Sequence, residues 1–234
     1  MTTPYLTLNE KEAIVWKDDN NQEHLLLMKQ DDMPQNPRMD FDQYDHMICW
    51  HRRYTLGDKH NYETPYDMLS DIATQVGITY KHDPSYEQLE KKLQKHVVML
   101  PLWLYDHSGI TMSCGERKWP YTDQWDSGQV GYIFMLKSEI FDHIGNVNRK
   151  TWRQKAIEFM TASVKEYDMY LTGDIYGYIL YDKNNDQWEE SDSCWGFYGS
   201  NIHENGIPDN IGYDFYEKLQ SNQYDIVDIT NIDL

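Results

Sequence analysis

The chain has 234 residues, of which 40% are hydrophobic and 14% aromatic, a composition typical of a folded protein and not of a disordered chain. Its 39 acidic and 21 basic residues give a net charge of −18, which repels the phosphates of nucleic acids and acidic membranes. We therefore expect neither direct nucleic-acid binding nor membrane binding. The three cysteines, Cys49, Cys114 and Cys194, form no CxxC pair, which excludes a zinc ribbon or a thiol redox motif.

The N-terminus has no signal-peptide pattern, because Met1-Thr2-Thr3-Pro4 is not a basic stretch followed by an apolar one. No apolar run approaches the roughly 18 residues that a membrane-spanning helix needs. We therefore expect the protein in the cytoplasm.

The residue pattern predicts a mixture of strands and helices. In chain order these are strands at 13–16, 24–28 and 46–51, helices at 64–77 and 83–96, strands at 97–105 and 129–136, a helix at 150–170, strands at 175–181 and 193–198, and a helix at 212–219. The helix at 64–77 has a clear start, because Thr64 is a capping residue, Pro65 follows it and Asp67 puts an acid in the first turn. Asn184-Asn185-Asp186 is a turn signal, so the strands on either side of it should form a hairpin.

These elements come in mixed runs without a regular strand–helix–strand alternation, which favours the α+β class over a doubly wound parallel sheet. We expect a mixed or antiparallel sheet with about three to four helices packed against it. In the helix at 150–170, the candidates for the buried stripe are Trp152, Ile157, Met160 and Val164. With no repeat, low-complexity tract or linker in view, residues 1–234 are interpreted as a single domain with acidic N- and C-terminal flanks.

The negative charge is concentrated near the two ends of the chain. Residues 1–48 have a net charge of −6 and residues 182–234 a net charge of −10, which leaves −2 for residues 49–181. Such flanks would attract a basic protein surface, for example the nucleic-acid channel of another protein. The candidate partner-binding residues are Asp40, Asp42, Asp45, Glu189, Glu190 and Asp192. The alternative is that these carboxylates only form a solvated face that keeps the protein in solution.

Common catalytic fingerprints are missing: the sequence has no Walker A loop, no GxGxxG after a strand, no HExxH and no GxSxG. A polar cluster is nevertheless expected at one sheet end, because Asp106 and His107 close one predicted strand and Asp126 opens the next. His51 on a third strand is a further candidate. An Asp-His-Asp set suits general acid–base chemistry, so these four residues are the candidate catalytic residues if the protein is an enzyme.

The same residues also have a structural interpretation, because Asp-His-Ser-Gly and Asp-Ser-Gly are ordinary turn sequences. A catalytic thiol is not expected, because Cys49 and Cys194 lie in apolar strands. The basic pair Arg52-Arg53 is expected to form internal salt bridges with carboxylates. The sequence assigns no cofactor and no metal ligands.

Several segments resemble a family of uncharacterised proteins encoded by bacteriophages and other bacterial mobile elements. The matching segments are residues 48–58, 100–113, 125–134, 167–177 and 193–199, with YDHSG, WDSGQVGY, YLTGD and CWGFYG among their motifs. Residues 114–124 depart from the family pattern, and the acidic flanks lie largely outside the matching span.

The resemblance implies an accessory protein of a phage or mobile element, acting in the host cytoplasm. Small acidic proteins of such origin often block host defence enzymes, and some imitate DNA phosphates with carboxylates. The expected function is therefore a non-catalytic acidic inhibitor of a host defence nuclease or effector, of the anti-CRISPR or anti-restriction type. The alternatives are an enzyme, a protein that sequesters a small molecule or nucleotide with the Asp/His cluster, and a structural component of a virion.

Overall fold

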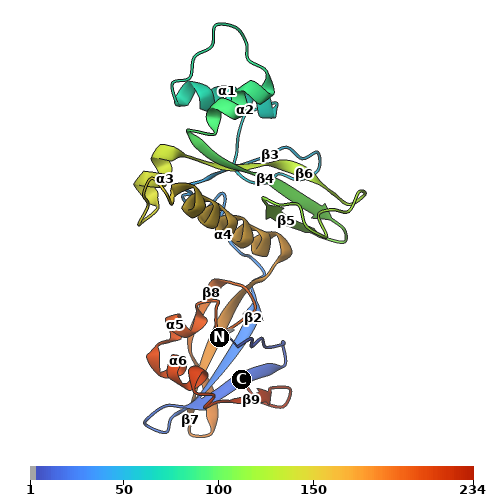
Figure 1. Ribbon diagram of the computed structural model, residues 1–234. Helices are drawn as coiled ribbons and strands as arrows, with labels where there is room; N and C mark the ends of the chain where they lie inside the picture. The colour runs from blue at the N-terminus through green and yellow to red at the C-terminus, as the bar shows by residue number, and fades with distance from the viewer. Residues whose placement is uncertain (1–3) are drawn as a thin grey trace. The chain divides into compact units, whose positions relative to one another are not determined.

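The computed structural model describes residues 4–234, which form nine strands and six helices in two separate antiparallel sheets (Figure 1). The expected α+β class is thereby confirmed. Of the two expected sheet types, mixed or antiparallel, the antiparallel one is present, in two sheets and not in one. The helices are somewhat more numerous than the three to four expected, because the fold includes two short ones of five and seven residues.

The internal contacts divide the chain into two compact units, where the sequence was interpreted as one domain. Unit 1 comprises residues 1–35 and 172–234, and unit 2 comprises residues 36–171. Unit 2 is thus an insertion in the sequence of unit 1. The two ends of the chain, which are far apart in sequence, belong to the same folded body.

Unit 1 contains a five-stranded sheet in the order β8-β7-β2-β1-β9. Its strands are β1 (Glu12–Lys17), β2 (Glu23–Gln30), β7 (Ile175–Asn184), β8 (Gln187–Tyr198) and β9 (Asp225–Asp228). Two short helices, α5 (Ile207–Ile211) and α6 (Tyr213–Gln220), pack on one face of this sheet.

Both faces of the unit 1 sheet are apolar at their centre. Ile14, Leu26 and Tyr178 form a core with the buried α6 residues Phe215 and Leu219. On the opposite face a second buried cluster is formed by Ala13, Leu25 and Leu27. Within residues 4–234 no helix packs on that face, and half-buried residues extend the cluster: Val15, Ile179, Tyr181, Trp188, Val227, Ile229 and Ile232.

The predicted hairpin is present and longer than expected, with β7 and β8 joined across Asn185 and Asp186. Both turn residues have a left-handed backbone, with φ of 48° and 65°. This is the conformation that tight hairpin turns require and that Asn and Asp tolerate. The first strand pair, β1 with β2, also has the expected antiparallel pairing.

Unit 2 has three layers, with a four-stranded sheet between helices. The sheet has the order β3-β6-β4-β5, formed by β3 (His46–Cys49), β6 (Ser127–Leu136), β4 (Val97–Asp106) and β5 (Ile110–Cys114). Helices α1 (Pro65–Gln75) and α2 (Tyr86–Leu93) cover one face, and α4 (Trp152–Thr172) covers the other. The short α3 (Lys137–His143) follows β6 directly.

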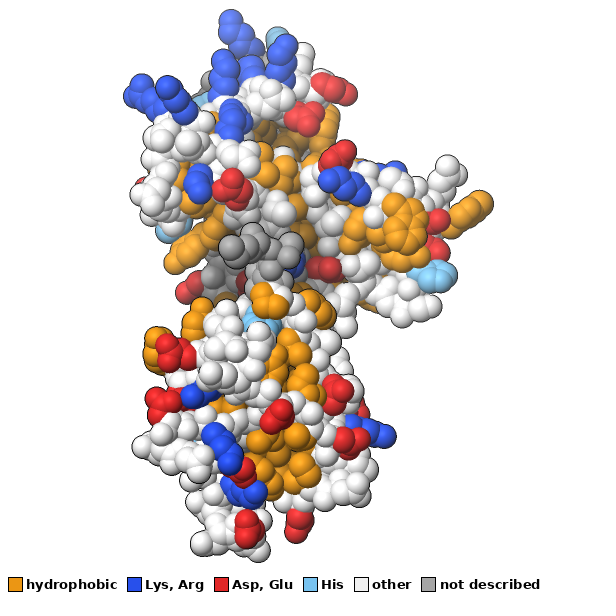
Figure 2. Space-filling view, turned by 60° about the horizontal axis from the view of Figure 1, so that its bottom comes forward, with side chains coloured by type: hydrophobic (Ala, Val, Ile, Leu, Met, Phe, Trp, Pro, Cys, Tyr) orange, Lys and Arg blue, Asp and Glu red, His pale blue; other side chains and the backbone are white. Residues whose placement is uncertain are grey.

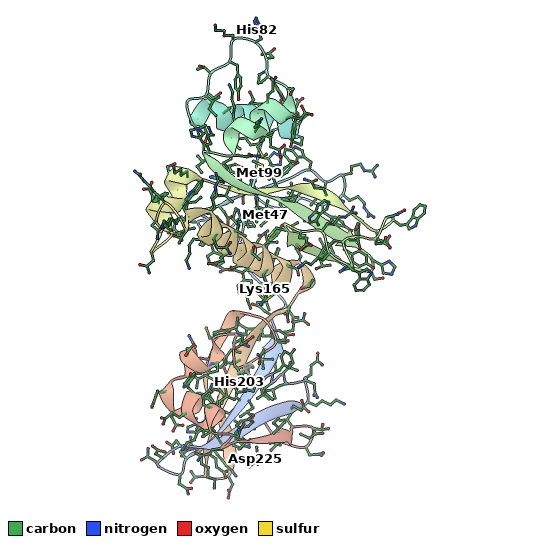
Figure 3. The ribbon with its side chains drawn as sticks, viewed as in Figure 1. Met47, His82, Met99, Lys165, His203 and Asp225 are labelled. Atoms are coloured by element: carbon green, nitrogen blue, oxygen red, sulfur yellow. The ribbon has the colours of Figure 1, made fainter. Side chains whose placement is uncertain are left out.

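The two faces of the unit 2 sheet bury separate cores. Met47 belongs to the core under α4, whereas Met99 packs against the core under α1 and α2, and Figure 3 labels both. The expected stripe on α4 is confirmed for Trp152, Met160 and Val164, while Ile157 is only half-buried. Alternation along β4 explains the division, since successive side chains of a strand point to opposite faces.

The start of α1 follows the sequence signal closely. Thr64 caps the helix in a reciprocal capping box with Asp67, and Gly77 just after the helix has a left-handed φ of 74°. Helix α2 is shorter than expected, because its cap is Ser85 and it ends at Leu93. The sequence reasoning missed β5, α3, α5 and β9, each of seven residues or fewer.

Candidate functional site

The charge of the protein is concentrated in unit 1. Unit 1 has 20 acidic residues, five lysines and no arginine, a net charge of −15, whereas unit 2 has 19 acidic and 16 basic residues, a net charge of −3. The two acidic ends of the sequence are therefore parts of one strongly acidic body. In Figure 2, hydrophobic side chains gather on one face of this unit, and both acidic and basic side chains lie around them.

Strand register sorts these charges between the two faces of the sheet. Lys17 and Lys183 both point to the helix-free face, where each contacts Glu23. Asp182 and Asp192 alternate with the helix-free positions and lie on the helix-bearing face instead. The sheet thus puts its lysines and these carboxylates on opposite sides.

The two short helices add carboxylates to the same side. We call the resulting surface the acidic face, defined by Asp182, Glu189 and Asp192 of the sheet and by Asp209, Asp214 and Glu217 of α5 and α6. One lysine, Lys218, lies on α6, and it pairs with Asp19 at 3.1 Å. None of the six carboxylates that define the acidic face makes a salt bridge with a lysine.

Hydrogen bonds from the unit 1 core fix several of these carboxylates. The buried Tyr178 donates its hydroxyl to Asp192 at 2.6 Å, and burial and this carboxylate raise the pKa of the tyrosine. Asp214 accepts the indole N–H of Trp16 at 3.1 Å. The acidic face is therefore held by rigid elements, which lowers the ordering cost of binding.

Two of the carboxylates oppose each other across adjacent strands. Asp182 on β7 is the register partner of Glu189 on β8. Like charges that lie directly opposite in a sheet destabilise it. His24 contacts Asp182 at 2.7 Å, and Asn184 donates its amide to Glu189 at 2.9 Å. These two contacts offset part of the repulsion between the two acids.

Three of the six sequence-predicted partner-binding residues lie on β8. Glu189 and Asp192 belong to the acidic face, and Glu190 points to the helix-free face with Tyr181. All three side chains are exposed.

The other three, Asp40, Asp42 and Asp45, lie in unit 2, apart from the acidic body. Asp40 accepts the backbone N–H of Asn36 at 2.7 Å, and Asp42 is exposed. Asp45 is fully buried and forms an ion pair with the buried Arg38 at 2.6 Å, so it presents no charge to a partner. Its expected exposure is therefore wrong, because the buried guanidinium holds it inside the fold.

The predicted catalytic residues do come together. Nδ1 of His107 lies 2.8 Å from Oδ2 of Asp126, and the backbone N–H of Asp106 donates to the carbonyl of Asp126 at 2.7 Å. Arg53 forms an ion pair with Asp106, which confirms the expected internal salt bridge for this arginine. His51 joins the group by stacking on Tyr54, whose hydroxyl lies 3.4 Å from Asp106. The pairing of β4 with β6 creates this polar cluster.

The polar cluster is solvent-exposed, which limits what it can do chemically. The side chain of His107 is 61% exposed and that of Asp126 is 39% exposed. The pair could orient an imidazole as a general base, but the nearby Ser127 is already occupied by hydrogen bonds to the backbone of Tyr121 and Asp123. Burial raises the pKa of the Cys49 thiol to about 12, so this cysteine is inert.

Within residues 4–234 no group of three or more His, Cys, Asp or Glu side chains is arranged to hold a metal ion. In the same part of the chain no helix is long and apolar enough to cross a bilayer. No family model, characterised protein or solved structure matches the chain.

Proposed function

We propose that the protein is a non-catalytic inhibitor that docks its acidic face onto the basic surface of a partner protein. The observation that carries this proposal is the distribution of charge: a net −15 in unit 1, with six carboxylates that have no lysine partner on the helix-bearing side of its sheet. The strand lysines Lys17 and Lys183 lie on the other side, together with Glu23 and Glu190. A protein that needed acidity only to remain in solution would have no reason to sort its charges in this way. The acidic face instead gathers six carboxylates on the side of the sheet that carries α5 and α6.

The class of partner follows from the chemistry of such a surface. Nucleic-acid enzymes bind a dense array of phosphates with basic channels, and carboxylates fixed on strands and helices imitate that array. The sequence resemblance to proteins of phages and mobile elements points to a host defence nuclease or effector as the target. The inhibitor would then compete with DNA for the basic channel.

A plating assay tests this function directly. Bacteria that carry a restriction or CRISPR system would express either the wild-type chain or one of two variants. The acidic-face variant is Glu189→Gln, Asp192→Asn, Asp209→Asn and Glu217→Gln. The matched control neutralises four exposed acids of unit 2: Glu63→Gln, Asp83→Asn, Glu116→Gln and Asp142→Asn. Both variants lose the same formal charge.

We expect the wild-type chain and the unit 2 control to restore phage plating, and the acidic-face variant to lose most of that effect. Exposed ion pairs contribute roughly 0.2–1 kcal/mol each, so the loss of four changes affinity by about fourfold to several hundredfold. Equal activity of the two variants would refute a role for the acidic face. A wild-type chain that is inactive against every system tested would refute the inhibitor function itself.

A second candidate function rests on the polar cluster. His107 and Asp126 form an oriented pair, and Arg53 lies beside them on Asp106, a combination that suits an anionic small molecule such as a nucleotide. Isothermal titration with nucleotides tests it, with His107→Ala and Arg53→Ala as variants. Binding that both variants abolish would favour this function, whereas no binding would exclude it.

A further inference from the structure

Strand β4 has an open edge along its first half. It lies between β6 and β5 in the sheet, but β5 pairs only with Leu102–Asp106. Just beyond β5, the N–H of Gly115 bonds to the carbonyl of Pro101 at 2.9 Å. From Val97 to Pro101, no strand within residues 4–234 pairs with the side of β4 that faces away from β6. A central strand therefore behaves as an edge strand over five residues.

The backbone of this half presents hydrogen-bonding groups to the open edge. The carbonyl of Pro101 points toward β5, and in an antiparallel ladder every second residue points its N–H and C=O the same way. Met99 therefore directs its N–H and C=O away from β6 and into the open edge. Such groups are obligatory hydrogen-bonding partners and a ready template for another strand.

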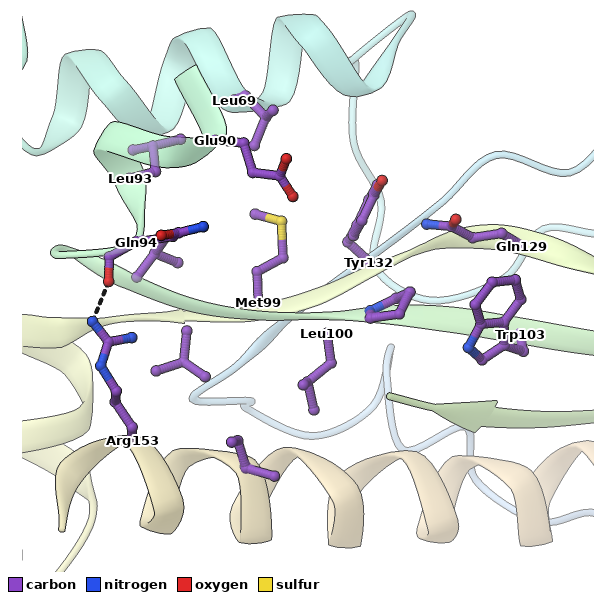
Figure 4. A pocket seen from close by; sticks show the side chains of 14 residues that line it. Leu69, Glu90, Leu93, Gln94, Met99, Leu100, Trp103, Gln129, Tyr132 and Arg153 are labelled. Carbon is purple, nitrogen blue, oxygen red and sulfur yellow. Dashed lines mark hydrogen bonds between the residues drawn. The ribbon is translucent and has the colours of Figure 1, made fainter. Parts of the chain in front are cut away.

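A cavity of about 420 Å³ follows this edge, a size in the usual range of ligand sites. Leu69 and Leu93 line it on the side of α1 and α2, and Leu100 lines it on the side of α4 (Figure 4). Ile157 of α4 also lines it. At one end Arg153 reaches from α4 to the carbonyl of Gln94, as the dashed line in Figure 4 shows. Helical layers thus lie above and below the place where a further strand would insert.

We propose that this groove binds an extended peptide segment of a partner protein, which adds to β4 as a strand. The unpaired backbone identifies the occupant as a peptide, because alternating N–H and C=O groups along an edge match another chain in the β conformation. The leucines and Ile157 on the two sides favour apolar side chains in the segment, while Glu90, Gln94, Gln129 and Arg153 add polar groups to the lining. A strand covered on both faces has a continuous run of apolar residues. The bound peptide segment therefore has about five apolar residues opposite Val97–Pro101.

The site is separate from the acidic face, because all its lining residues belong to unit 2. It adds a second mode of recognition to the molecule. Backbone pairing and apolar burial depend weakly on salt, in contrast to binding through carboxylates.

Selection from a display library of random short peptides tests the proposal. We expect the wild-type chain to enrich peptides with a continuous apolar core and no proline within it. Single N-methylation along a selected peptide should weaken binding about tenfold or more at every second residue and little at the residues between, because alternate amides face β4. Amide NMR shifts of the protein should change at residues 97–101.

The Met99→Pro variant removes the one N–H that Met99 turns toward the groove and no ladder bond to β6. Its matched control is Met99→Leu, which keeps that N–H. We expect Met99→Pro to lose about tenfold or more in peptide affinity, and Met99→Leu to bind as the wild type does. Circular dichroism of both variants checks the fold. If Met99→Pro unfolds, the N-methyl series on the wild-type chain still decides the question.

Three results would overturn the proposal: no enriched peptide, peptides that tolerate N-methylation at every residue, or shift changes located away from β4. Light scattering adds a further test, because a dimer whose formation protects the amides of residues 97–101 would assign the groove to a second copy of the chain.

Discussion

The buried Arg38 forms ion pairs with two carboxylates inside unit 2. Its side chain is 1% exposed and binds Asp45 at 2.6 Å and Asp58 through two bonds of 2.8 Å. Burial raises the pKa of Asp45, and one of its oxygens has no hydrogen-bond partner. The arginine therefore compensates two carboxylates, one of which is removed from water.

The Arg38→Ala substitution should destabilise unit 2 by about 3–5 kcal/mol, because it leaves a buried carboxylate without its counter-charge. The double variant Arg38→Met with Asp45→Leu should recover much of that loss. Urea unfolding at pH 7 measures both. Equal stabilities of Arg38→Ala and the wild type would show that the ion pair does not hold the fold together.

A pH-dependent contribution is expected from His46. A hydrogen bond of 2.8 Å to Glu139 raises the pKa of His46, while the pKa of Glu139 is lowered by its bonds despite burial. A raised histidine pKa stabilises the fold fully below the ordinary value of about 6.5, and the effect disappears as the pH rises through the folded-state value. Because the imidazole is partly exposed, we expect roughly 0.5 kcal/mol.

The measurement compares the unfolding free energies of the wild type and His46→Gln between pH 5 and 8. Their difference should shrink as the pH rises. His46 also stacks on Phe134, and the loss of this contact adds a pH-independent amount to the difference in unfolding free energy. A difference that stays constant over this range would rule out the ion pair as its source.

The position of a side chain could be predicted where nearby sequence decides it, and could not where distant residues decide it. The meeting of His107 with Asp126 was predictable, because both flank the ends of adjacent apolar strands. The burial of Asp45 was not, because it depends on a guanidinium that also needs Asp58 and Ser163 to be satisfied. Glu189 and Glu190 point to opposite faces as successive residues of a strand, and only the register reveals which of them lies on the helix-bearing face.

At the scale of elements, long runs and capped helices were predictable and short pieces were not. The capping box at Thr64 and the turn at Asn185 each specify a structure within a few residues. By contrast, β9 has four residues, too few for a period-two pattern, and it exists because it pairs with β1. Whether such short strands form depends on their pairing with distant strands and not on the local sequence.

The contact between β3 and β6 depends on a glycine. A Cβ at Gly131 would lie 2.0 Å from the carbonyl oxygen of Ile48 and 2.9 Å from the Cα of Cys49. Gly131→Ala should therefore destabilise unit 2 by about 3 kcal/mol or more, because the obstructing atoms are backbone. Gly128→Ala on the same strand meets nothing within 4 Å and is the matched control. Similar melting temperatures for the two variants would contradict this account.

Strand β8 offers a way to separate stability from binding. Glu189→Gln removes the repulsion with Asp182 and keeps an oxygen that can accept the amide of Asn184. We expect unit 1 to gain about 0.5 kcal/mol in urea unfolding while partner binding weakens. A variant that loses stability would show that the carboxylate supports the fold.

At the scale of the whole molecule, the sequence indicated that both ends are acidic, but not that they belong to the same folded unit. Counting charges along the sequence located the excess of acidic residues in 1–48 and 182–234. It could not show that residues 4–35 and 172–234 share one sheet, because that depends on the pairing of β2 with β7 across more than a hundred residues. The same pairing decides which acids share a face.

The salt dependence of binding tests the central claim most directly. The partner is the defence protein that the plating assay identifies, and its Kd would be measured at increasing salt for the wild type, the acidic-face variant and the unit 2 control. We predict that Kd rises steeply with salt for the wild type and the control. In the acidic-face variant, the dependence of log Kd on log salt concentration should be clearly weaker. A Kd that does not change with salt, or equal slopes for both variants, would contradict the account.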